Sequence, residues 1–187
     1  MPQDFRKPTP AEIRAAVGKT VADVIAPDLR VLFVGINPGL YTAAIGHHFG
    51  RPGNRFWPTL YAAGFTGRLL SPYEERELLR WGYGITNMVP RATAGANDLS
   101  VDELLQGGQM LVEKVRAYRP KTLAVLGISA YRIAFRQPRA VLGPQPEALD
   151  GVPVWVLPNP SGLNAHYQLD ALARLFGELK QVVERST

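Results

Sequence analysis

The sequence predicts an α/β protein, a single-domain three-layer α/β/α sandwich built on a central, mainly parallel sheet. Two apolar segments carry this prediction, residues 31–34 (VLFV) and residues 154–157 (VWVL). Such runs of β-branched and aromatic residues are typical of strands that a parallel sheet buries on both faces. Between them, helix-forming segments alternate with further short apolar runs. At 187 residues the chain is long enough for one domain with a proper core.

The N-terminal region precedes the first predicted strand. Residues 1–25 contain three prolines and predict a loose basic arm, made of the first ten residues, followed by a helix over residues 11–25. The alternative is that the arm is a terminal segment without a role. The domain proper is expected over residues 26–187, and it begins with a strand at residues 30–34.

Local signals then predict the next elements in order. Pro58 fits the first turn of a helix over residues 54–63, where a proline is tolerated. The SPYE motif at residues 71–74 combines a capping box with a proline at the first helical position, and it predicts a helix that ends near Gly82. A strand over residues 84–89 follows.

The second half of the chain repeats the strand–helix order. The SVDE motif at residues 100–103 is a second capping box and opens a long helix to about residue 118. Asp150-Gly151 is a hairpin signal that pairs a short edge strand with the strand after it. The remaining patterns predict a strand over 122–126, a short helix from about 129, an irregular proline-rich stretch over 136–151, a strand over 152–157 and a final helix over 169–184.

Composition narrows the classes of function. The chain has a net charge of +5 and a pI near 9.7, and most of its basic residues are arginine, which favours a polyanionic partner, although an ordinary basic surface would look the same. It has no cysteine, which excludes disulfides, thiolate chemistry and a cysteine-bound iron–sulfur cluster. No apolar run approaches the ~20 residues of a membrane span, and no secretion leader is evident. A cytoplasmic monomer without a membrane partner is therefore expected.

Asn-Pro turns follow both of the buried strands. The first is the GINPG segment at residues 35–39, and the second is the NPSGL segment at residues 159–163. Ligands of open α/β sheets bind outside the carboxyl ends of the strands, so we expect the two turns to lie side by side against one ligand. The Asn37 carboxamide can position a water, although it has no pKa suited to a general base. The alternative is that Asn37 and Asn159 merely cap their turns.

Residues near the first turn are further candidates. Phe49 lies in a polar, glycine-flanked loop, where packing in the core and packing within the loop both fit an aromatic ring. The adjacent His47 and His48 are expected to be solvated loop residues, because no other ligand cluster accompanies them. Arg55 either binds a phosphate or folds back on a carboxylate, and Asn54 is a candidate helix cap.

Two more side chains have two interpretations each. The Ser161 hydroxyl can hold a phosphate, or it can stabilise its own turn. Asp98 lies in a loop of small residues at the ligand edge of the sheet, where its carboxylate can accept a proton from the water held by Asn37. The alternative, which the sequence slightly favours, is that Asp98 supports the start of the following helix electrostatically.

Four motifs together give the chain a specific resemblance: GINPG (35–39), PGNRFW (52–57), TNMVPRAT (86–93) and LPNPSGLN (157–164). Through them the chain, from about residue 26 to 183, resembles the mismatch-specific uracil-DNA glycosylases, the thymine-DNA glycosylase-like branch of the uracil-DNA glycosylase superfamily. The resemblance implies a uracil-DNA glycosylase-like fold, in which Asn37 orients the attacking water and Phe49 stacks on the flipped base. It also implies that Gly162 and Leu163 belong to a loop that wedges into the duplex.

The chain departs from the classical uracil-DNA glycosylases at three positions. The resemblance places Asn37 where those enzymes have aspartate, Gly39 where they have a bulky tyrosine that excludes the thymine methyl, and Asn159 where they have histidine. It therefore implies slower water activation, a roomier base pocket and weaker stabilisation of the leaving base. Some closer relatives carry an arginine shortly after the wedge leucine that contacts the opposite guanine, whereas this chain has Ala165 there.

The predicted function is that of a monofunctional DNA glycosylase in a bacterial-type cytoplasm, associated with the nucleoid through DNA. It is expected to flip uracil, and thymine or a modified cytosine as well, from duplex DNA with G:U or G:T mismatches, and to leave an abasic site for base excision repair. No cofactor or metal is expected. The alternatives are a non-catalytic module that binds damaged DNA and a nucleotide-binding enzyme, against which the lack of a glycine-rich phosphate loop argues. The candidate residues are Asn37 and Asp98 for catalysis, Gly35, Ile36, Phe49 and Asn159 for base binding, and Arg55, Ser161, Gly162, Leu163 and Asn164 for DNA binding.

Overall fold

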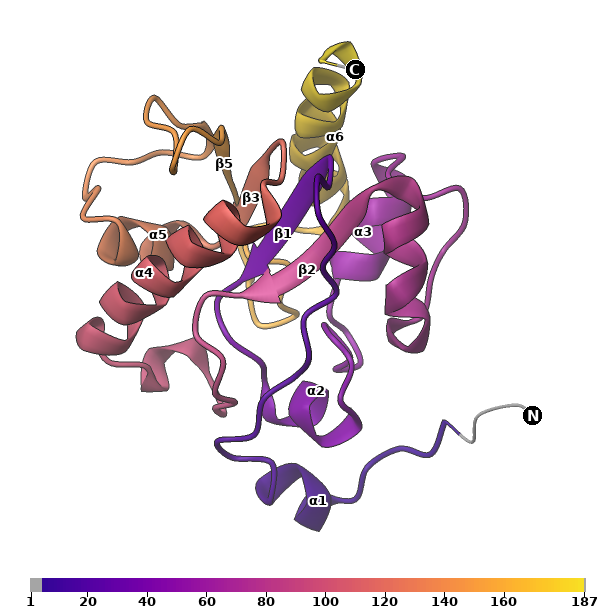
Figure 1. The fold of residues 1–187 in the computed structure, drawn as a ribbon. Helices are drawn as coiled ribbons and strands as arrows, with labels where there is room; N and C mark the ends of the chain where they lie inside the picture. The colour runs from indigo at the N-terminus through magenta and orange to yellow at the C-terminus, as the bar shows by residue number, and fades with distance from the viewer. Residues whose placement is uncertain (1–4, 187) are drawn as a thin grey trace.

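A central sheet of five strands organises the computed structural model, which describes residues 5–186 (Figure 1). The strands are β1 (Val31–Gly35), β2 (Tyr83–Asn87), β3 (Leu123–Leu126), β4 (Gly143–Pro144) and β5 (Val154–Leu157). Their order is β2-β1-β3-β5-β4, and all neighbouring pairs are parallel except β4 with β5. The predicted α/β fold with a mainly parallel sheet is confirmed.

Helices cover both faces of the sheet and complete the three layers. The α-helices are α1 (Pro10–Arg14), α2 (Leu40–Ile45), α3 (Phe56–Ala62), α4 (Val101–Tyr118), α5 (Ile128–Ala134) and α6 (Leu169–Arg185), and the 3₁₀ helices are η1 (Pro72–Trp81) and η2 (Ala96–Asp98). Side chains alternate along each strand. Phe33 therefore packs in a core with α3 and α6, whereas its neighbours Leu32 and Val34 pack in a second core with α4 and α5.

The helices that capping boxes predicted are present in the structure. Ser100 and Glu103 form the expected capping box at the start of α4, and their side chains and backbone amides bond reciprocally. The predicted helix from residue 72 is present as a 3₁₀ helix, and it is kinked at Glu74, which has φ −98° and ψ 15°. The hairpin predicted at Asp150-Gly151 is also present, since Leu149 and Val152 form an antiparallel bridge around it.

The helix predicted over residues 11–25 is wrong beyond its first turn. The α1 helix ends at Arg14, and Gly18 follows with a φ of +78°, which a helix cannot contain. The chain then runs extended, and Val24 pairs with Ile85 through two backbone hydrogen bonds of 2.9 and 2.8 Å. This pairing covers the outer edge of β2, and the satisfaction of that sheet edge outweighs local helix propensity. The basic arm lies partly outside the described residues, and Phe5 within it contacts Tyr73, with ring centroids 4.4 Å apart and the ring planes tilted by 39°.

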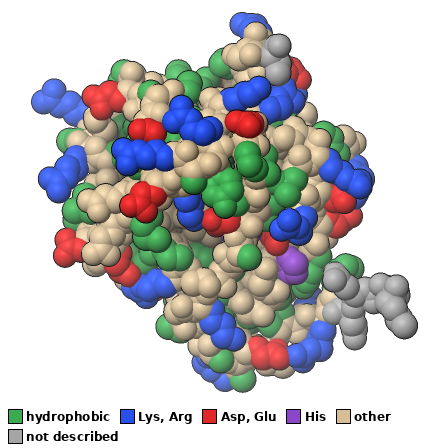
Figure 2. All heavy atoms as spheres, in the orientation of Figure 1, with side chains coloured by type: hydrophobic (Ala, Val, Ile, Leu, Met, Phe, Trp, Pro, Cys, Tyr) green, Lys and Arg blue, Asp and Glu red, His purple; other side chains and the backbone are tan. Residues whose placement is uncertain are grey.

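Basic side chains are spread over the surface in the orientation of Figure 2, with acidic side chains between them. This distribution agrees with the net charge of +5. Among residues 5–186, no helix combines the length and the apolar character that a membrane span requires.

A close approach between α4 and the end of β2 supplies the first testable prediction. A Cβ added to Gly107 would lie 2.7 Å from the carbonyl oxygen of Met88, which follows β2 directly. We expect Gly107→Ala to lower the free energy of unfolding by about 1–3 kcal/mol, because backbone must shift to admit the methyl group. Gly177→Ala in α6 is the matched control, since a Cβ there meets nothing within 4 Å. Urea unfolding of both variants measures this free energy. Equal free energies of unfolding for Gly107→Ala and Gly177→Ala would contradict the prediction.

Candidate functional site

The two Asn-Pro turns meet at the carboxyl edge of the sheet, as predicted. Together with the end of β2 they enclose a cavity of about 370 Å³. Its walls include Asn37, Phe49, Asn87 and Asn159, which come from four separate segments. A larger cavity of about 490 Å³ adjoins it beneath α5 and shares Ile36 with it. That second cavity lacks Asn37 and Asn87, so the smaller cavity is the candidate site.

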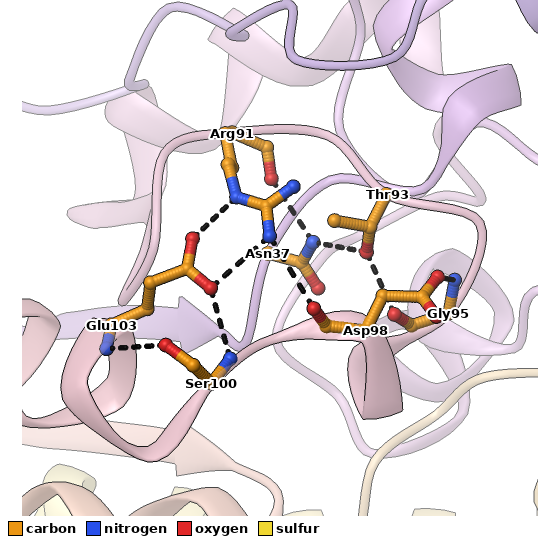
Figure 3. Close-up of polar contacts among 7 residues, drawn as sticks. All are labelled: Asn37, Arg91, Thr93, Gly95, Asp98, Ser100 and Glu103. Atoms are coloured by element: carbon orange, nitrogen blue, oxygen red, sulfur yellow. Dashed lines mark hydrogen bonds and ion pairs between the residues drawn. The ribbon is translucent and has the colours of Figure 1, made fainter.

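The carboxamide of Asn37 is held in one orientation (Figure 3). Its Nδ2 donates to the carbonyl oxygen of Arg91 at 3.0 Å and to Thr93 Oγ1 at 2.8 Å. The Thr93 hydroxyl gives its only proton to the carbonyl of Gly95 at 2.7 Å, so it can only accept from Asn37. Both partners are acceptors, and the amide nitrogen must therefore face them. The Oδ1 atom of Asn37 is left as the acceptor for a ligand or a water.

The structure adds Asn87, which the sequence analysis had not singled out. Asn87 ends β2, pairs in register with Gly35 and lines the cavity. Its Nδ2 lies 3.4 Å from Nδ1 of His48, whose Nε2 lies 2.8 Å from the carbonyl oxygen of Ala22. Because a carbonyl only accepts, His48 carries its proton on Nε2, and Nδ1 accepts from Asn87. The strand-end argument that identified Asn37 applies equally to Asn87 within the TNMVPRAT motif.

The expectation of solvated loop histidines is wrong. His48 is 1% exposed, and His47 is half-buried. The buried Glu75 bonds both residues, since its Oε2 accepts from the backbone amide of His48 at 2.7 Å and its Oε1 lies 3.0 Å from His47 Nδ1. Burial lowers the pKa of His48 below its usual value, although Glu75 acts in the opposite direction. The histidine pair is therefore a structural support for the loop that carries Phe49.

Phe49 has a ring that lines the cavity and a backbone with a positive φ of +52°. One face of the ring stacks on Phe56, with centroids 4.0 Å apart. A Cβ on Gly35 would lie 3.3 Å from the Phe49 ring and 2.7 Å from Asn87 Oδ1. Glycine is therefore required at position 35 if the aromatic ring and the carboxamide are to meet at one wall.

The second turn holds its own shape through asparagine side chains. Asn159 Oδ1 accepts from the amide of Ser161 at 3.0 Å, and Asn164 Nδ2 donates to the Asn159 carbonyl at 3.1 Å. The Ser161 hydroxyl accepts from the amide of Leu163 at 3.3 Å, which is the turn-stabilising contact. Leu163 is 70% exposed at the tip. No described residue bonds the NH₂ of Asn159, so this donor is available to a ligand.

Arg55 binds the second turn instead of a carboxylate. Its guanidinium donates to the carbonyls of Ser161 at 2.8 Å and Asn164 at 2.6 Å, and also to the Tyr167 carbonyl and the Gln168 side chain. These contacts hold residues 161–168 in place. The sequence analysis had expected Arg55 to bind either a phosphate or a carboxylate, and it binds neither among the described residues. The guanidinium positions the turn and is not directed at an external phosphate.

The turn also packs against the loop before α3. A Cβ on Gly162 would lie 2.8 Å from the carbonyl oxygen of Gly53. The cap predicted at Asn54 is displaced by one residue, because the N-cap of α3 is Arg55, and Asn54 Oδ1 accepts instead from the amide of Phe56 at 2.9 Å. Arg51 lines the gap between the loop and the turn, and it is exposed with no side-chain bond to any described residue. Arg51 is thus better placed than Arg55 to meet a phosphate.

Asp98 stands beside the cavity and not in it. Its Oδ2 accepts from the backbone amide of Gly95 at 3.0 Å, whereas its neighbour Asn97 lines the cavity. The carboxylate therefore organises the loop that follows Thr93. Within residues 5–186, no cluster of three His, Cys, Asp or Glu side chains is arranged to hold a metal ion.

A family model matches most of the chain. The model of the Uracil DNA glycosylase superfamily matches residues 22–180. This range contains both Asn-Pro turns, the strand end with Asn87 and the histidine pair.

The buried imidazole makes stability depend on pH. The pKa of His48 in the folded protein lies below the ordinary value of 6.5, so below that pH the unfolded chain binds a proton that the folded chain excludes. The contribution of neutral His48 to the free energy of unfolding is fully present above pH 6.5 and is lost as the pH falls. We expect His48→Gln to flatten the decrease in unfolding free energy between about pH 7 and pH 5. Urea unfolding at several pH values tests this, and identical pH profiles for both proteins would refute it.

Proposed function

We propose a mismatch-directed DNA glycosylase activity for this chain, which belongs to the Uracil DNA glycosylase superfamily. Members of that superfamily are hydrolases that release uracil from DNA. The proposed enzyme is a monomer that flips uracil out of a duplex with G:U mismatches, hydrolyses the bond to deoxyribose and leaves an abasic site for base excision repair. It acts in a bacterial-type cytoplasm and associates with the nucleoid through its DNA substrate.

The fixed carboxamide of Asn37 carries this proposal. Since its NH₂ group is bound to Arg91 and Thr93, only Oδ1 can face a water in the cavity. An amide cannot take up the proton at neutral pH, so Asn37 orients the water and leaves the sugar cation to drive its capture. Asp98 supports the neighbouring loop through the Gly95 amide, and the proposal does not require it as a proton acceptor.

Recognition of the base follows from the orientation of Asn87. Its NH₂ group faces His48, so its Oδ1 is presented beside Gly35 and Phe49. A carbonyl acceptor there suits the N3–H of uracil or thymine and opposes the N3 lone pair of cytosine. Phe49 supplies the ring for stacking the flipped base. The free NH₂ of Asn159 and nearby backbone amides would stabilise the departing anionic base.

The proposal extends to thymine because of the space beside Gly39, whereas a modified cytosine keeps the N3 lone pair that Asn87 Oδ1 opposes. A Cβ at that position would meet nothing within 4 Å. No side chain at residue 39 therefore fills the space that a bulky residue would occupy in a uracil-only pocket. This supports the excision of bases with a substituent on C5, such as thymine in a G:T mismatch.

Replacement of Asn37 tests the proposed reaction. A duplex with one U:G mismatch is incubated with excess protein, and abasic sites are then cleaved with alkali. We expect wild type to give strand scission and Asn37→Ala to lose about 10²–10³-fold in the single-turnover rate, as for other positioned polar groups, while DNA affinity is kept. Asn97→Ala is the control, because Asn97 lines the same cavity without orienting a water in the proposal. Binding without scission by wild type would favour a non-catalytic DNA-binding module.

Replacement of Leu163 tests the proposed wedge. Leu163 is exposed on a turn held rigid by Asn159 and Arg55, so its side chain can fill the gap left by a flipped nucleotide. Flipping from a duplex costs a few kcal/mol that single strands do not require. Leu163→Ala should therefore slow excision from duplex far more than from single-stranded DNA. Leu69→Ala, at another exposed leucine, should change neither rate. Equal losses on both substrates with a lowered Tm would show that Leu163 is a packing residue.

A further inference from the structure

An ion pair lies behind the loop that holds Asn37 (Figure 3). The guanidinium of Arg91 forms two hydrogen bonds to the carboxylate of Glu103, from Nε to Oε1 and from Nη2 to Oε2 at 3.1 Å. Its Nη2 also donates to the carbonyl of Asp98 at 3.3 Å. This planar, two-bond arrangement fixes direction as well as distance. Arg91, near the start of the loop between β2 and α4, is therefore tied both to Asp98 near the end of that loop and to the first turn of α4.

Glu103 is itself anchored to the helix. Its Oε2 accepts from the amide of Ser100 at 2.9 Å, and its own amide donates to the Ser100 hydroxyl at 3.1 Å. The bond from Arg91, followed by the bond from Ser100, lowers the pKa of Glu103 to about 2. The carboxylate is thus ionised at any pH at which excision would be measured. An 18-residue helix provides a firm base for this group.

The peptide after Arg91 connects this ion pair to Asn37. The carbonyl of that peptide accepts from Asn37 Nδ2, and its N–H, on Ala92, donates to the Lys19 carbonyl at 2.8 Å. One peptide plane is therefore held between the N-terminal segment and Asn37, while the side chain of Arg91 holds it to α4. A rotation of this plane would remove one of the two acceptors that keep the Asn37 amide from flipping.

We infer that Glu103 is a positioning residue for base excision: through Arg91 it holds the peptide that keeps Asn37 Oδ1 directed at the attacking water. The inference rests on the proposed role of Asn37. It gives the capping box of α4 a second purpose beyond helix stability. Glu103 does not line the cavity, so its effect must pass through Arg91 and Asn37.

The chain offers a matched control for the removal of this carboxylate. Asp150 bonds two arginines, Arg116 at 3.2 Å and Arg119 at 3.3 Å, and its side chain is 27% exposed, compared with 28% for Glu103. It lies just before β5, at the edge of the sheet opposite the cavity. Asp150→Asn and Glu103→Gln remove the same charge and disrupt comparable ion pairs. They differ in their distance from Asn37.

Single-turnover excision on the U:G duplex separates positioning from stability. We expect Glu103→Gln to slow the excision step about tenfold, which is less than the roughly hundredfold cost of a 1 Å misplacement. DNA affinity should stay unchanged, and Asp150→Asn should match wild type. In the Asn37→Ala background, Glu103→Gln should cause no further loss, because the residue through which it acts is gone. A rate within twofold of wild type, or the same loss in both backgrounds, would overturn the inference.

A second measurement does not depend on activity. The side-chain NH₂ of Asn37 gives an NMR signal that Asn37→Ala identifies by its loss. In wild type this NH₂ should be shifted from the values of a free asparagine and protected from exchange. Glu103→Gln should move the signal toward those values, and Asp150→Asn should not. An unchanged signal in Glu103→Gln would overturn the inference, whereas an inactive wild type with the expected shift would overturn only the proposed function.

Discussion

The parallel register of β1 against β2 is the constraint on which the site depends, because it pairs Gly35 with Asn87 at the carboxyl edge of the sheet. A side chain at position 35 would occupy the space of Asn87 Oδ1 and press on Phe49. With glycine there, a carboxamide and an aromatic ring can form one wall. β3 lies between β1 and β5, and all three strands run in the same direction. The turn after β5 therefore reaches the same edge and closes the cavity from the other side.

Except for Arg51, the side chains that line the cavity are neutral, and the charged groups that support them stand behind. Asn37 and Asn87 are each oriented by partners whose donor or acceptor roles are fixed. The partners of Asn37 are a backbone carbonyl and a hydroxyl that already donates its proton elsewhere. The partner of Asn87 is the buried, neutral imidazole of His48. Glu75 and Glu103 act one contact further away, on backbone and on Arg91. This arrangement suits a site that must accept a polyanionic substrate, because none of the described residues that line the cavity is an aspartate or a glutamate that would repel it.

The sequence was sufficient for the features that local chemistry decides. Capping boxes predicted η1 and α4, and apolar runs predicted the buried strands. The Asn-Pro turns that follow two of these strands predicted the position of the cavity. Three features depended on tertiary contacts that no local pattern carries. The segment near Val24 is extended because it covers the edge of β2, His48 is buried by distant backbone, and Arg55 is used by carbonyls more than 100 residues away. Asn87 could have been predicted from the sequence, because it also ends a buried strand before a loop.

The use of amides in place of ionisable groups explains why so many bonds are devoted to orientation. A carboxylate can accept a proton from water in several geometries, whereas a carboxamide contributes only by holding the water at the right place. Its oxygen and nitrogen are similar in shape and opposite in role, so a flipped amide would present a donor where an acceptor is required. The proposed role of Asn37 therefore depends on the groups that prevent the flip, which are the Thr93 hydroxyl bonded to Gly95 and the carbonyl of Arg91, whose side chain is bonded to α4. Geometry of this kind is lost through small displacements, so the loop between β2 and α4 is as much a part of the site as the cavity wall itself.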